Sequence, residues 1–98
     1  MKTSEKYKSL IIELSRLDIK CVMMRKDQLV ISNDKRKSAW LTCNKSDWFI
    51  VTWKPERYKI YNKTNIVDVC KSFLDDAAPS SVISDFIVNK YNLEKMND

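Results

Sequence analysis

The sequence predicts an α+β fold with an N-terminal helix, a five-stranded antiparallel meander sheet and two C-terminal helices. Apolar residues recur at helical spacing near both ends of the chain and alternate with polar residues through its middle. The turns between the alternating runs are short and polar, which favours antiparallel hairpins over the longer connections that parallel strands need. A chain of 98 residues, 44% of them apolar, is expected to form one domain over residues 1–98.

The first helix is expected from about Ser4 to Leu17. Its apolar residues follow the i, i+3, i+4, i+7 spacing of a single stripe, while polar residues fill the other side. The stripe consists of Tyr7, Leu10, Ile11, Leu14 and Leu17. Thr3 or Ser4 can cap the free amides of the first turn. Such a stripe needs a flat apolar surface to cover, which the sheet provides.

Residues 38–61 hold all three tryptophans and two of the four tyrosines, and we expect them at the middle of the sheet. The strands are expected at Ile19–Met24, Gln28–Ser32, Ser38–Cys43, Trp48–Trp53 and Arg57–Tyr61. Because a proline precedes it, the last strand is expected at an edge, with Tyr58 and Ile60 facing inward. The chain has no glycine, so positive φ in its turns is expected from Asn33–Asp34 and Asn44.

Two helices are expected after the strands. Thr64 or Asn65 caps the first, over Ile66–Ala77, and Pro79 suits the first turn of the second. One face of that second helix consists of Val82, Ile83, Phe86, Ile87 and Tyr91. Residues from Glu94 onward are expected to fray. The helix at residues 66–77 is expected on the same sheet face as the first helix; the other face is left to the last helix, a partner or solvent.

The composition argues against most enzyme chemistry. Without glycine there is no phosphate-cradling loop, and without histidine there is no Ser-His-Asp triad or histidine-based zinc site. Cys21, Cys43 and Cys70 are widely spaced among apolar neighbours, as expected of reduced core thiols in the cytoplasm. We therefore expect a protein that is not an enzyme and has no cofactor, no catalytic residues and no metal site.

The charge is unevenly distributed along the chain. Residues 20–63 carry 11 lysines and arginines against four acidic residues, whereas residues 64–98 carry three against six. The predicted sheet is therefore basic and the C-terminal region acidic. A surface of one sign steers oppositely charged partners toward it.

These features predict a small protein-binding inhibitor, of the kind that immunity or phage anti-defence proteins represent. A basic, aromatic sheet surface would occlude the partner, with cations steering the encounter and rings supplying affinity. Its residues are expected to be Lys35, Arg36, Lys37, Trp40, Trp48, Arg57, Lys59 and Tyr61. The expected partner is a protein with an acidic surface, such as a toxin or a defence enzyme.

Two other associations are compatible with the sequence. A nucleic-acid-binding accessory protein could use the same surface, with cations along the phosphates and rings stacked on bases. An edge strand at Arg57–Tyr61, or near Ile19–Met24, could pair with its counterpart in a symmetric homodimer. No apolar run approaches the roughly 18 residues that cross a bilayer, so no membrane partner is expected.

Overall fold

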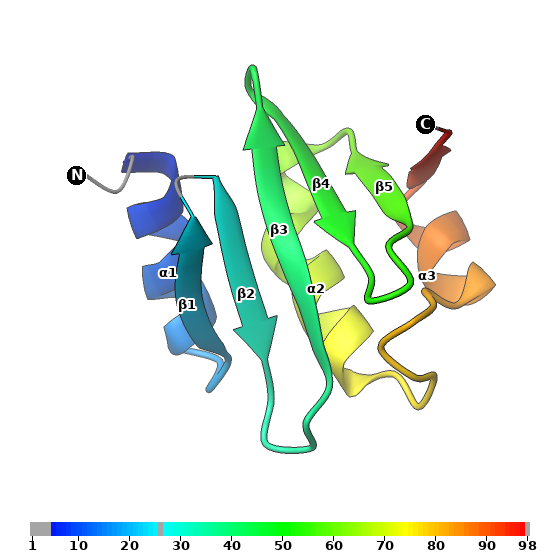
Figure 1. Ribbon diagram of the computed structural model, residues 1–98, viewed down its shortest axis with the longest axis horizontal. Helices are drawn as coiled ribbons and strands as arrows, with labels where there is room; N and C mark the ends of the chain where they lie inside the picture. Colours follow the sequence, from blue (N-terminus) through cyan, green and yellow to red (C-terminus); the bar gives the residue numbers. More distant parts are fainter. Residues whose placement is uncertain (1–4, 26, 98) are drawn as a thin grey trace.

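A computed structural model describes residues 5–25 and 27–97 of the chain. Helix α1 (Glu5–Ser15) comes first, and an antiparallel sheet and two further helices follow (Figure 1). The strands are β1 (Lys20–Arg25), β2 (Gln28–Ser32), β3 (Ser38–Asn44), β4 (Asp47–Val51), β5 (Arg57–Ile60) and β6 (Glu94–Met96). The remaining helical segments are the 3-10 turn η1 (Lys63–Asn65), α2 (Ile66–Asp75) and α3 (Asp85–Lys90).

The strand order across the sheet is β1-β2-β3-β4-β5-β6, and every neighbouring pair is antiparallel. The predicted α+β class and meander are confirmed, but the sheet has six strands rather than five. The sixth strand pairs with β5, where Met96 lies opposite Arg57 and Glu94 opposite Lys59. The predictions of an edge at 57–61 and of a frayed C-terminus were therefore wrong. Leu93, which is buried, holds the C-terminal segment against the core.

All three helices lie on one side of the sheet, behind it in Figure 1. Alternate strand residues point toward them and form the core, in which Leu29, Ile31, Leu41 and Ile50 have no exposed surface. The last helix belongs to the same layer as α2, because the Tyr91 hydroxyl directly after α3 lies 2.9 Å from the Ser72 Oγ. The opposite face of the sheet carries no helix of the described chain.

The first two helices follow their predicted stripes. Helix α1 buries Tyr7, Leu10 and Leu14 of its predicted stripe, but it ends at Ser15, so Leu17 lies beyond it and is 39% exposed. Helix α2 buries one apolar face, made of Ile66, Val69, Cys70, Phe73 and Leu74. The predicted caps of α1 lie outside the described residues. Ahead of α2 it is Asn62 that caps, because its Oδ1 accepts the Thr64 amide and so begins the turn η1. Within residues 5–25 and 27–97, no helix has the length and apolar character to span a membrane.

The last helix is shorter than predicted. The segment that follows Pro79 stays irregular, because the Ser80 carbonyl accepts the Trp53 amide and the Ser80 Oγ accepts the Ser38 amide. These hydrogen bonds tie the segment to the sheet before α3 begins. Phe86, predicted on the buried face of this helix, is instead 73% exposed.

Two turns of the sheet differ from the prediction in the residues that adopt positive φ. Positive φ occurs at Arg36 in the β2–β3 turn and at Lys45 and Ser46 in the β3–β4 turn, not at the predicted asparagines. Asn33 works through its side chain, whose Oδ1 accepts the amides of residues 35 and 37. Its Nδ2 donates to the Leu74 carbonyl at 2.7 Å, which joins this turn to α2.

Candidate protein-binding face

The face of the sheet without helices, here called the open face, carries a row of mostly apolar residues. Successive strand registers place one residue of each strand side by side across the whole sheet. The row consists of Val22, Val30, Trp40, Val51, Arg57 and Met96. Val22 is 58% exposed at the β1 end, and the central members are half-buried by their neighbours. A continuous apolar row on a bare face is unusual for a solvated sheet surface.

Trp53 adds a second indole to this face from the loop after β4. Its ring centroid lies 4.3 Å from that of Trp40. Its Nε1 donates to the Ser38 Oγ at 2.7 Å, and its amide donates to the Ser80 carbonyl. The side chain is therefore fixed from two directions yet stays 53% exposed. A ring that is already ordered loses little conformational entropy when a partner covers it.

On the β5 side of the open face, the cations contact aromatic rings and a carboxylate. The Arg57 guanidinium lies 4.5 Å from the Phe49 ring centroid. The Lys59 Nζ lies 4.7 Å from the Tyr61 ring centroid and 3.7 Å from an Asp47 carboxylate oxygen. The Tyr61 hydroxyl donates to the Glu94 carboxylate, and this hydrogen bond raises the pKa of Tyr61. This end of the face is consequently mixed in charge.

A shallow depression of about 330 Å³ lies on the open face. Its lining combines aliphatic and aromatic surface with three polar groups. It is lined by Met24, Arg25, Gln28, Trp40, Thr42, Val51 and Pro55. A depression of this size and lining can receive a side chain of a partner.

Six of the eight predicted binding residues lie at the surface or on the open face. Trp40, Arg57 and Lys59 are half-buried members of the open face, and Tyr61 is exposed just past β5. Lys35 and Arg36 are exposed in the turn between β2 and β3.

The other two predicted residues, Trp48 and Lys37, are buried. Trp48 points to the helical side, where its ring packs edge-on against Tyr7 with centroids 5.2 Å apart. Both faces of β4 are apolar, so strand alternation alone does not tell which of them the helices cover. Trp48 therefore has no place on the open face.

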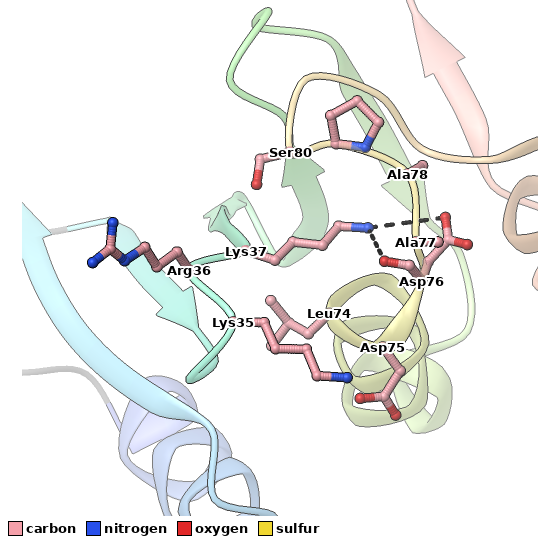
Figure 2. Close-up of a pocket in the computed structure, with 10 residues that line it drawn as sticks. Lys35, Arg36, Lys37, Leu74, Asp75, Asp76, Ala77, Ala78 and Ser80 are labelled. Atoms are coloured by element: carbon pink, nitrogen blue, oxygen red, sulfur yellow. Dashed lines mark hydrogen bonds and ion pairs between the residues drawn. The ribbon is translucent and has the colours of Figure 1, made fainter.

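Lys37 crosses from the β2–β3 turn to the end of α2 (Figure 2). Its Nζ donates to the Asp76 carbonyl at 2.9 Å, lies 3.9 Å from an Asp76 carboxylate oxygen and 4.3 Å from the Phe73 ring centroid. Burial lowers the pKa of Lys37, and the Asp76 carboxylate opposes that shift. Figure 2 shows Arg36 pointing away from this contact. Lys37 therefore fastens the turn to α2, while Lys35 and Arg36 are exposed to solvent.

The prediction missed several residues of the open face. Val22, Met24, Arg25 and Trp53 all lie on it or beside it, and none was selected from the sequence. Alternation within a strand shows which of its residues share a face. Only the register between strands shows which residues of different strands lie on the same face of the sheet.

None of the three cysteine thiols, all within the described residues, provides a reactive group on the open face. Cys43 and Cys70 are buried, Cys21 is half-buried, and all three are free. Burial raises the pKa of the Cys21 and Cys70 thiols, which keeps them protonated. No protein-family model, curated protein or solved structure matches the chain.

Proposed function

We propose that this protein acts by binding another protein through the open face of its sheet. The proposal is supported above all by the apolar row that crosses six strands on a face without helices. Covering such a row with a partner removes apolar surface from water, which is the main driving force of protein association. The surface also has the composition of interface centres, where Trp, Met and Arg are enriched.

Charge at one end of the face supports an acidic partner. Lys20 starts the edge strand, and Arg36 points away from α2 in the adjacent β2–β3 turn, whereas Lys35 of that turn lies near Asp18, Asp34 and Asp75. Exposed cations of this kind accelerate encounter with an acidic surface more than they add affinity. The rings and aliphatic side chains then supply the lasting contact.

The role that suits this surface is occlusion. An apolar face that crosses the whole sheet can cover a partner's active site or substrate channel without chemistry of its own, as a small inhibitor of the immunity or anti-defence type does. A toxin or a defence enzyme is the class of partner to which this role points. Three free thiols suit a reducing compartment, and the cytoplasm is the proposed location.

Nucleic acid is the alternative partner for the same face, and the exposed indole of Trp53 is the feature that favours it. The carboxylates of Asp47 and Glu94 count against it, because they lie among the cations of β5 and would meet phosphates. Binding to nucleic acid would weaken steeply as salt rises, roughly with the number of phosphates contacted.

The test uses capture from a lysate of the native host, with and without nuclease, by wild-type protein and by two variants. Trp53→Glu places a charge on the open face, and Phe86→Glu places the same charge on an aromatic position of α3 that is also exposed. We expect one protein to be captured by wild type and by Phe86→Glu after nuclease treatment, and its capture to fall at least tenfold with Trp53→Glu. Equal capture by both variants would refute the open face as the binding site, and capture abolished by nuclease would favour the alternative.

Association kinetics with the captured protein test the steering charges separately. Changing Lys35 and Arg36 to Glu is expected to slow association several-fold at low salt while dissociation stays similar. An unchanged association rate would remove the β2–β3 turn from the proposal.

A further inference from the structure

An irregularity in the edge strand determines which side chains surround the depression on the open face. In β1, residues 20 to 23 pair one to one with β2, but the register shifts between Met23 and Arg25. Arg25 then lies opposite Gln28, so that Met24 is the extra residue of a bulge. Regular alternation would have turned Arg25 to the helical side together with Cys21 and Met23.

The shift brings Arg25 to the open face. The row next to the apolar row contains Gln28, Thr42 and Phe49, which pair across β2, β3 and β4. Arg25 belongs to this row because it pairs with Gln28. Met24 and Arg25 are both exposed, and both line the depression. Bulges commonly re-aim a side chain at binding sites, at the cost of a regular ladder position.

Arg25 has no carboxylate partner among the described residues. Lys37, Lys59 and Lys95 each form an ion pair, whereas no described acidic residue pairs with Arg25. A guanidinium presents a planar set of donors that match a carboxylate, and it packs readily on apolar surface. It therefore complements an acidic group that arrives together with an apolar side chain.

We propose that the depression receives an apolar side chain of the partner against Trp40, Val51 and Met24, and that Arg25 binds a carboxylate next to that side chain. The partner would thus dock through a segment in which an aliphatic or aromatic residue adjoins Asp, Glu or a chain terminus. Gln28 and Thr42, between the apolar wall and Arg25, offer an amide and a hydroxyl to the backbone of the segment. This inference rests on the proposed function, and it specifies the chemistry of the partner.

The first experiment pans a randomised 12-residue peptide library, displayed on phage, against purified wild-type protein and against Arg25→Glu. We expect the wild type to enrich peptides with an apolar residue beside an acidic one. These peptides should lose at least tenfold in affinity to Arg25→Glu and to Thr42→Trp, which fills the depression, but should bind Lys63→Glu like the wild type. Arg25→Glu should instead enrich peptides with Lys or Arg beside the apolar residue. The inference would be overturned if no peptides were enriched, or if the enriched peptides had no excess of acidic residues. It would also be overturned if they bound Arg25→Glu as tightly as the wild type.

The second experiment separates this inference from the proposed function by adding Arg25→Glu to the lysate capture. Loss of capture with both Trp53→Glu and Arg25→Glu would support both the proposed function and the contact of Arg25 with a carboxylate. Loss with Trp53→Glu alone would leave the open face as the binding site and overturn the carboxylate contact. Capture that neither substitution changes would refute both together.

Discussion

The hydroxyl of Tyr7 completes the sheet at the point where β2 begins, and its removal should be costly. Strand β2 starts at Gln28, opposite Thr42, so the next residue of β3, Cys43, has no β2 residue beside it. The Tyr7 hydroxyl accepts the Cys43 amide at 3.0 Å and donates to the Asp27 carbonyl at 2.8 Å. Tyr7 is only 1% exposed, so water cannot easily replace this contact.

The substitution Tyr7→Phe keeps the ring and its packing on Trp48 but leaves the Cys43 amide without an acceptor. A buried donor without a partner costs about 1–3 kcal/mol. The Asp27 carbonyl lies in an exposed turn and can turn to water, so most of the loss comes from Cys43. We expect about 2 kcal/mol of lost unfolding free energy, which for a domain of this size lowers Tm by roughly 10 °C.

Urea and thermal unfolding followed by circular dichroism would measure this loss. Tyr91→Phe is the matched control, because among the described residues its hydroxyl bonds to the Ser72 hydroxyl and both residues are half-buried, so water can replace that bond. Its expected cost is below about 1 kcal/mol. Equal stability of the two variants would refute the proposed role of the Tyr7 hydroxyl.

The pH dependence offers a second measurement of the same contact. Burial raises the pKa of Tyr7 above its usual value of 10.0. The neutral hydroxyl is therefore favoured in the folded protein, and its contribution is complete below pH 10 and is lost as the pH rises through the folded pKa. Wild type should lose stability more steeply than Tyr7→Phe above about pH 10, so the difference between the two should shrink there.

Two further substitutions test other contacts. Lys37→Met leaves the half-buried Asp76 carboxylate without its cation and should cost about 2 kcal/mol in urea unfolding, without changing the rate of association with a captured partner. Slower association with unchanged stability would show Lys37 to be a binding residue after all. Ser46→Gly relieves the positive φ of 79° in the β3–β4 turn and should raise the unfolding free energy by about 1 kcal/mol, seen as a higher urea midpoint. Ser80→Gly, outside that turn, should not stabilise, and a gain there equal to that of Ser46→Gly would contradict the explanation.

The elements with strong local patterns could be predicted from the sequence. The stripe from Tyr7 to Leu14 and the alternating runs of β2, β3 and β5 specify their own type, because each buries one face along several residues. Strand β6 has only three residues, too few for a period to appear, and its existence depends on β5 and on buried Leu93.

The binding face was harder to predict because it depends on contacts between distant parts of the chain. Trp48 and Trp40 look alike in sequence, yet the first lies under Tyr7 and the second on the open face. Lys37 lies in a run of basic residues that is typical of a solvated turn. Its burial depends on its hydrogen bond to the Asp76 carbonyl at the end of α2, 39 residues away in the sequence. Arg25 reaches the open face only through the bulge, which alternation does not reveal.

The order of strands in space is their order in the chain, and this has a consequence for how the protein is made. Five of the six strands, together with α1, can pair in sequence as they leave the ribosome, each against the strand before it. The free side of β5 stays unpaired until residues 94–96 have been translated, because β6 is the strand that pairs with it. Until then the growing sheet has an unpaired edge at β5, and a chain that terminates before residue 94 would keep that edge exposed.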